Sequence, residues 1–263
     1  MSTLVVFHAH PDDEAIATGG TMAKAAADGH RVVLVVATRG ERGEVADGYL
    51  EPGEELWQRR VEETHAAAAV LGASRVEFLG YVDSGMAGLP SNVDPASFWQ
   101  ADVEEAARRL AGILQEEGAD ILTAYDENGV YGHPDHVQVY RIGVRAAELA
   151  ATPRVYLSTV DKDFIRRSMA DALASGVTMP GDLDPVELDI GVAGERITTT
   201  VDVVDFLDLK RKAMACHASQ ISDASFFLAM APEMFKVAFG QEWYILVGAL
   251  PGRTHETDIF AGL

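Results

Sequence analysis

The sequence predicts an α/β protein built on a Rossmann-like, mostly parallel sheet flanked by helices. Short runs of Val, Leu and Ile alternate with longer Ala-rich segments over the first 160 residues, which is the βαβα pattern of such a sheet. The chain has 263 residues, 48% of them hydrophobic, which suits one large α/β domain with a buried core.

Each predicted strand is short and rich in β-branched residues, as strands buried on both faces are. The strands are residues 4–7, 32–37, 75–79, 120–124 and 154–159, and apolar periodicity between them predicts helices over residues 15–27, 54–71, 98–116 and 134–150. Gly29, Gly72 and Gly118 stand where a helix C-cap would precede the next strand. Right-handed crossovers should then place the strands in parallel.

Three segments interrupt this alternation. Residues 38–53 are rich in Gly and Glu and predict a mobile loop, residues 80–94 predict another loop, and residues 175–189 predict a connector. A strand over residues 197–201, helices from about residue 202 and a last strand over residues 243–248 follow. We expect one domain over residues 1–263, with a core of residues 1–160 and a small C-terminal α/β lobe of residues 161–263.

The charge balance narrows the possible partners. Lys and Arg number 21 against 41 Asp and Glu, which gives a net charge of -20. Such a surface repels nucleic acids, which need clustered cations, and anionic membranes. The apolar runs are too short for a membrane span, and no basic segment precedes the first apolar residues as in a signal peptide. We expect a cytoplasmic protein that binds a small molecule, with no nucleic-acid or membrane partner and its oligomeric state open.

A first group of ionisable residues follows the first strand directly, as His8-Ala9-His10-Pro11-Asp12-Asp13-Glu14. Ligands bind at the carboxyl ends of strands in parallel sheets, and buried carboxylates need partners there. A divalent metal would be such a partner, and mixed His and Asp ligands suit Zn²⁺ or Fe²⁺ better than Ca²⁺ or Mg²⁺. The alternative is a solvated acidic turn at the N-terminus of the next helix.

A second group follows the fourth strand, as Tyr125-Asp126-Glu127-Asn128-Gly129-Val130-Tyr131-Gly132-His133-Pro134-Asp135-His136. Pro134 fits the first turn of a helix, so His133 is the predicted N-cap and His136 faces the same side one turn later. One His-x-x-His pair is weak evidence. Two such groups at one edge of a sheet together offer two His and one Asp to a metal. Cys216 is the only cysteine, which excludes a Cys-rich zinc module.

These two groups, His10-Pro11-Asp12-Asp13-Glu14 and His133-Pro134-Asp135-His136, resemble motifs of the PIG-L/LmbE-like family of zinc-dependent de-N-acetylases. Other similar segments are Thr38 to Glu44, Arg60-Val61-Glu62-Glu63 and His217-Ala218-Ser219-Gln220. Asp83-Ser84-Gly85-Met86 and Tyr131-Gly132-His133 look like the actinobacterial branch, which deacetylates N-acetylglucosaminyl-inositol or cleaves mycothiol conjugates.

The resemblance implies roles for nine residues. By it, His10, Asp13 and His136 ligate zinc, Asp12 is the general base, and Arg60 and Asp83 hold substrate hydroxyls. His133, paired with Asp135, stabilises the tetrahedral intermediate as a cation or acid, and Tyr131 polarises the amide carbonyl or binds the oxyanion. Three protein ligands leave the open position that catalytic zinc requires, although Fe²⁺ could occupy the same ligands. The implied reaction is hydrolysis of an N-acetyl group on a glucosamine-containing small molecule, which releases acetate.

Two other functions remain open. Two His and one carboxylate also form the iron site of non-haem Fe(II) oxygenases, although those sites usually lie on all-β barrels. A non-catalytic or regulatory protein could keep the metal on the same fold. Nucleotide binding lacks its glycine-rich fingerprints, and no G-x-S-x-G elbow offers a serine nucleophile. His8 is predicted to be a packed strand-end residue, and His217 belongs equally to late-helix structure or to a pocket wall.

Overall fold

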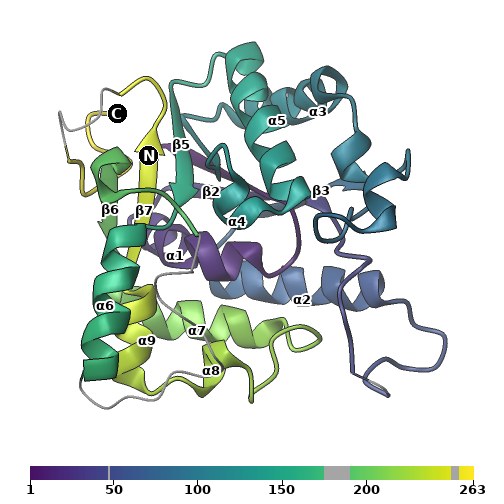
Figure 1. The fold of residues 1–263 in the computed structure, drawn as a ribbon. Helices are drawn as coiled ribbons and strands as arrows, with labels where there is room; N and C mark the ends of the chain where they lie inside the picture. The colour runs from purple at the N-terminus through teal and green to yellow at the C-terminus, as the bar shows by residue number, and fades with distance from the viewer. Residues whose placement is uncertain (47, 175–189, 250–254) are drawn as a thin grey trace.

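One sheet runs through the whole molecule (Figure 1). The computed structural model describes residues 1–46, 48–174, 190–249 and 255–263. Its strands are β1 (Thr3–His8), β2 (Arg31–Thr38), β3 (Arg75–Tyr81), β4 (Ile121–Tyr125), β5 (Arg154–Thr159), β6 (Thr199–Asp202) and β7 (Gln241–Leu246), in the order β3-β2-β1-β4-β5-β7-β6. The first five pair in parallel, and β7 is antiparallel to β5 and β6. The predicted α/β fold class is confirmed.

Helices cover both faces of this sheet (Figure 1). They are α1 (Gly19–Ala27), α2 (Leu56–Val70), α3 (Val103–Glu117), α4 (Gly129–Gly132), α5 (Pro134–Ala150), α6 (Lys162–Ala174), α7 (Leu207–Cys216), α8 (Phe226–Ala229) and α9 (Pro232–Phe239). Leu4 and Val6 of β1 pack in one core with α1, α2 and α7. Val5 and Phe7 point to the other face and pack in a second core with α3 and α5, because successive strand residues face opposite sides.

The largest differences between the observed and the predicted elements are at three places. The helix predicted from residue 15 begins with a π-helical turn, Glu14–Thr18, before α1. The helix predicted from residue 98 is a short 3₁₀ turn followed by α3, because the Asp102 carboxylate accepts from Glu105 N and caps a new start. Helix α6 was not predicted, and the connector over residues 175–189 lies outside the described residues.

The C-terminal part extends the sheet of the N-terminal part. Strand β7 pairs with β5 from Tyr156 to Thr159, and β6 pairs with β7. Residues 161–263 therefore add antiparallel strands to the edge of the same sheet, with α7 packed beside α1 and α2 (Figure 1). Within the described residues, no helix has the length and apolar composition that a membrane crossing requires.

The sheet order determines where a ligand can bind. Strand β1 lies between β2 and β4. The chain runs outward from β1 through β2 to β3, and then crosses to β4 on the other side of β1. In open α/β sheets, ligands bind at the carboxyl ends of the strands beside such a reversal. The segments that follow β1 and β4 carry both ionisable groups of the sequence, and this topology places them next to each other.

Candidate metal centre

Three loops at the carboxyl edge of the sheet bring the predicted residues together. The loop after β1 supplies His10 to Asp13, the loop after β3 supplies Asp83, and the start of α5 supplies His133 to His136. Among the described residues, two groups have potential ligand atoms within 4.8 Å of one another: His10, His133 and His136, and His10, Asp83 and Asp135. The cluster could therefore hold a metal ion.

Asp13 lies between the two histidines to which the sequence analysis joined it. Its Oδ2 is 3.4 Å from His10 Nδ1 and 3.4 Å from His136 Nε2. Ligand atoms around a tetrahedral zinc ion are about 3.3 Å apart, given metal–ligand distances of about 2.0 Å. Burial would raise the pKa of Asp13, but the imidazoles of His136 and His10 outweigh it and hold that pKa well below its usual range. The carboxylate is therefore charged and ready to bind a cation.

His136 gives the clearest sign of a missing partner. The residue is 2% exposed, yet neither ring nitrogen has a hydrogen-bond partner within the described residues. Buried polar atoms are nearly always hydrogen-bonded. Its ring stacks on Tyr125 at 4.3 Å between centroids, which fixes the direction of Nε2 toward Asp13. A metal at Nε2 would satisfy this atom, so the residues present fit a bound metal.

Asp135 supports His10 instead of His133, which corrects the predicted pairing. Its Oδ2 accepts from His10 Nε2 at 3.0 Å, and its carboxylate also accepts from the backbone and hydroxyl of Ser84. Burial lowers the pKa of His10, but hydrogen bonds with Asp13, Asp135 and Asp83 raise it well above its usual value. Such a carboxylate–histidine contact orients the ring and leaves Nδ1 for the metal. Sequence spacing could not reveal this partner because Asp135 lies on another loop.

His133 takes its predicted place as the N-cap of α5. Its Nδ1 accepts from the backbone N–H of Asp135 at 3.2 Å, so the proton of the neutral ring is on Nε2. Burial, together with the neighbouring His10 and His136, lowers the pKa of His133 to about 4. The ring is therefore neutral at pH 7 and offers an N–H donor. Tyr131 lies beside it with 47% of its surface exposed.

Asp12 has a strained backbone, with φ at 89°, a region that residues with a Cβ rarely adopt. Its side chain is 19% exposed. Burial raises the pKa of Asp12 to about 6, and the charge of Arg60 opposes that rise. Asp12 and Asp13 are neighbours in sequence, but they differ in contacts and in the direction of their pKa shifts. The structure thus separates a carboxylate that pairs with Arg60 from one that lies between two imidazoles.

Arg60 and Asp83 lie beside the cluster with contacts of their own. Arg60 is 4% exposed and donates to Gly40 O, Pro11 O and Asp12 Oδ2. These contacts orient Asp12, and the predicted binding of substrate hydroxyls by Arg60 stays untested. Asp83 Oδ1 lies 3.5 Å from His10 Nε2 and accepts from Gly85 N. Burial would raise the pKa of Asp83, but the hydrogen bond to His10 and its charge lower it.

A layer of residues beneath the predicted metal-ligating side chains was not predicted from the sequence. Tyr125, the last residue of β4, stacks on His136, and its hydroxyl is 2.7 Å from His8 Nδ1. His8 is 1% exposed and also hydrogen-bonds Thr18, so it is packed as predicted. Gly129 has φ of 61°, and a Cβ there would lie 2.6 Å from His136 Cβ. Tyr125 could have been found, because a strand-end aromatic directly precedes the second ionisable group.

Glu14 and His217 form a second buried pair next to Asp12. Their Oε1 and Nε2 atoms are 2.6 Å apart, and both side chains are 0% exposed. Burial lowers the pKa of His217, but the charge of Glu14 outweighs this and raises it. The structure therefore places His217 in the buried wall behind the cluster.

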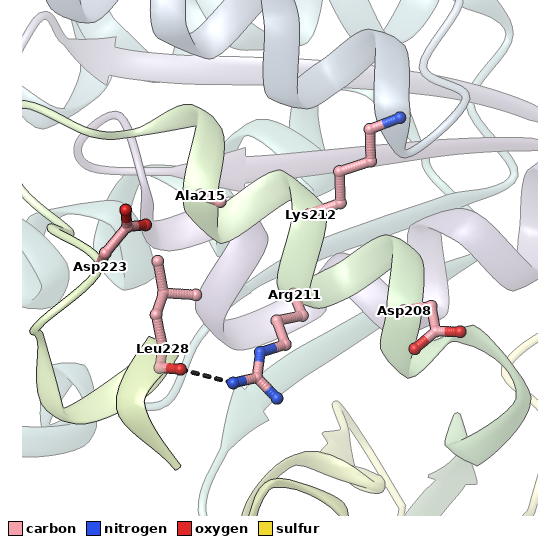
Figure 2. Close-up of a pocket in the computed structure, with 6 residues that line it drawn as sticks. All are labelled: Asp208, Arg211, Lys212, Ala215, Asp223 and Leu228. Atoms are coloured by element: carbon pink, nitrogen blue, oxygen red, sulfur yellow. Dashed lines mark hydrogen bonds between the residues drawn. The ribbon is translucent and has the colours of Figure 1, made fainter. Parts of the chain in front are cut away.

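A hollow of about 440 Å³ lies elsewhere on the surface, lined by Asp208, Arg211, Lys212, Ala215, Asp223 and Leu228. Figure 2 shows Arg211 turned toward the Leu228 carbonyl and Lys212 pointing the other way. Arg211 donates to Leu228 O and Met230 O, so its cation already has partners within the protein. The hollow shares no residue with the metal cluster and offers no comparable chemistry.

Comparison with known proteins identifies a family that matches the part of the chain with this cluster. The family described as PIG-L, GlcNAc-PI de-N-acetylase, matches residues 5–147, which include both ionisable groups. A 1D-myo-inositol 2-acetamido-2-deoxy-alpha-D-glucopyranoside deacetylase of Thermomonospora curvata is 39% identical, over 99% of this chain and 96% of the relative. The Acidothermus cellulolyticus protein of the same name is 40% identical, over 99% and 95%.

Solved structures share the fold at lower identity. An N,N'-diacetylchitobiose deacetylase from Pyrococcus horikoshii is 24% identical with a TM-score of 0.60, over 95% of this chain and 84% of that one. This likeness supports the architecture of the sheet and its helices.

Proposed function

Because the chain belongs to the PIG-L family of GlcNAc-PI de-N-acetylases, we propose that it is a metal-dependent amide hydrolase. Its substrate is a small molecule that contains N-acetylglucosamine, and the products are acetate and a primary amine. The relatives named above favour the N-acetylglucosaminide of myo-inositol as that substrate. The observation that carries this proposal is the buried His136, whose ring nitrogens make no hydrogen bond within the described residues and whose Nε2 faces the charged Asp13.

Zinc is the proposed metal, held by His10 Nδ1, Asp13 Oδ2 and His136 Nε2. Two neutral imidazoles and one carboxylate suit Zn²⁺, and Fe²⁺ is the alternative metal for the same ligands. When bound, the metal supplies a Lewis acid that polarises a carbonyl and activates water near neutral pH. Asp135 keeps His10 Nδ1 directed to the ion by accepting from Nε2.

The neighbouring side chains supply proton transfer and hydrogen bonds. Asp12 is the general base that accepts a proton from the attacking water, because its carboxylate is partly exposed and lies beside the ligands. Neutral His133 donates from Nε2 to the developing oxyanion or the leaving nitrogen. Tyr131, whose pKa burial raises, stays protonated and donates from its hydroxyl.

Metal content and acetate release test this function together. The purified protein should carry about one zinc per chain and release acetate from N-acetylglucosaminyl-inositol faster than from simple N-acetylglucosamine glycosides or N-acetyl peptides. His136→Ala should weaken metal binding by more than about 100-fold, because a lost ligand costs more than a lost supporting contact. His65→Ala, on the exposed face of α2, is the matched control.

Three outcomes would contradict the proposal or its ligand assignment. Full zinc loading without acetate release from any of the substrates would favour the non-catalytic alternative. Oxygen consumption by the Fe²⁺ form, again without acetate release, would favour the oxygenase. Retention of stoichiometric zinc in His136→Ala would reject the ligand assignment.

A further inference from the structure

The unusual backbone conformation of Asp12 is held by contacts from residues outside its own loop. Its φ of 89° is costly for a residue with a Cβ. Such a conformation persists only where the surroundings hold it. On one side, Arg60 donates to Pro11 O and to Asp12 Oδ2. The N–H of the same Pro11–Asp12 peptide donates to a residue of the following turn.

That residue is Glu14. Its Oε2 accepts from the backbone N–H of Asp12 at 3.1 Å, so the carboxylate holds the Asp12 amide from below. The π-helical turn that begins at Glu14 returns Ala15 N and Ile16 N to Asp12 O, at 3.0 and 3.1 Å. A carboxylate with no exposed surface is costly unless it has a charged or strong hydrogen-bond partner.

His217 is this partner, and it comes from the far end of the chain. It is the C-cap of α7, and its Nε2 donates to Glu14 Oε1 at 2.6 Å. Its own backbone carbonyl accepts from Gln220 N and Ile221 N, which holds the backbone that carries this side chain. One carboxylate thus joins His217 through Oε1 to the Asp12 amide through Oε2.

We propose that the Glu14–His217 pair is a positioning device that holds Asp12 in its left-handed backbone conformation and thereby aims the Asp12 carboxylate at the reacting water. The role of that carboxylate rests on the proposed function, whereas the backbone geometry does not. Both side chains are fully buried, and their contacts lead to the Asp12 amide, so both act through Asp12. The device also explains why a glutamate follows the paired aspartates: an apolar residue there would leave the Asp12 amide without an acceptor.

Kinetics of three variants test the device. His217→Leu removes the donor to Glu14 and should lower kcat about 10- to 100-fold, the effect expected for a displaced catalytic group, with KM within about twofold and zinc still at about one per chain. His217→Gln keeps an N–H donor and should restore kcat to within about threefold of the wild type. Met214→Leu, a buried change on the same helix, should leave kcat unchanged.

A double variant separates the device from general packing. In the Glu14→Ala background, His217→Leu should cause no further loss of kcat, because both changes break one chain of contacts. Additive losses, or an equal loss in His217→Gln and His217→Leu, would overturn the proposal.

Crystal structures of the same variants give a readout that does not depend on activity. Asp12 should keep its positive φ in the wild type and in His217→Gln, and leave it in His217→Leu. An unchanged Asp12 in His217→Leu overturns the device whatever the activity. A wild type without deacetylase activity whose Asp12 still moves in His217→Leu supports the device and rejects the proposed function alone.

Discussion

Two adjacent aspartates show how the environment of single residues assigns chemistry. Asp13 faces two imidazoles at 3.4 Å, and its pKa is depressed. Asp12 turns the other way because of its positive φ, and its pKa rises to about 6. A charged ligand and a carboxylate able to take up a proton therefore stand side by side. The sequence can predict that two neighbouring carboxylates diverge, but only the backbone angle shows which of them turns away.

Asp12→Asn tests this separation at the residue scale. We expect zinc content to stay near one per chain and kcat to fall by roughly 10²- to 10⁴-fold, because an amide cannot accept a proton in general base catalysis. Metal analysis and acetate release measure the two effects on the same preparation. Asp13→Asn is the control and should lose metal. Loss of metal from Asp12→Asn instead would mean that the two roles are exchanged.

The predicted site illustrates what a sequence can and cannot reveal about single residues. Spacing and strand-end position identified His10, Asp12 and His136 because each follows a strand or starts a helix. Partners across loops were not accessible: Asp135 reaches His10, although sequence proximity suggests His133. Arg60, which the resemblance assigns to substrate, also donates to Pro11 O and Gly40 O, and its substrate role stays a prediction. Such contacts depend on three-dimensional packing, which local patterns do not encode.

At the scale of elements, periodicity located strands well and helix starts less well. The central strands are continuous apolar runs, so burial on both faces defines their limits. The start of α1 differs because Glu14 has a buried hydrogen-bond partner in His217, and the chain forms a π-helical turn to reach it. Helix α6 was missed because residues 159–202 matched no pattern that the sequence analysis could interpret.

The ends of three elements are joined by Glu117, the last residue of α3. Its carboxylate accepts from Arg31 Nε at 2.5 Å and from Arg75 Nη1 at 2.7 Å, at the starts of β2 and β3. The hydrogen bond from Arg31 is the main cause that lowers the pKa of Glu117 from 4.5 to about 2. A depressed pKa stabilises the fold above pH 4.5, and this contribution is lost as the pH falls through about 2.

Glu117→Gln should therefore lower the free energy of unfolding at pH 7 by about 1 kcal/mol, a value that allows for solvent screening near the surface. The difference from wild type should be smaller at pH 4 and should vanish only below pH 2, near pH 1.5, as measured by urea unfolding. Glu116→Gln is the control, because Glu116 is 65% exposed and pairs with the same Arg75. An equal difference at all three pH values would show that Glu117 acts through packing and not through charge.

At the scale of the whole molecule, a buried ion pair within the C-terminal part is hydrogen-bonded to the N-terminal part. Lys210 of α7 donates to Glu242 of β7 at 2.5 Å, and the two side chains are 1% and 2% exposed. The Glu242 carboxylate also accepts from Gly20 N and Thr21 N, the first turn of α1, at 2.8 and 2.9 Å. The residues before and after position 160 therefore share one polar network as well as one sheet, which supports a single cooperative domain.

Lys210→Met tests this coupling. The change leaves the Glu242 carboxylate buried without its cation, which costs about 3–5 kcal/mol when no other donor remains. Because Gly20 and Thr21 still donate, we expect the lower value, about 3 kcal/mol, and a fall in Tm of roughly 6–12 °C for a chain of this size. Adding Glu242→Gln should recover part of the loss, because no charge is then left buried.

Lys24→Met gives the matched control, since the Lys24–Asp28 pair is 33% and 51% exposed and should contribute less than about 1 kcal/mol. Far-ultraviolet and near-ultraviolet circular dichroism should report one shared transition in every variant, because the C-terminal strands complete the sheet on which α1 and α7 pack. A separate early transition in Lys210→Met would contradict the single domain and show that residues 161–263 unfold as a lobe of their own.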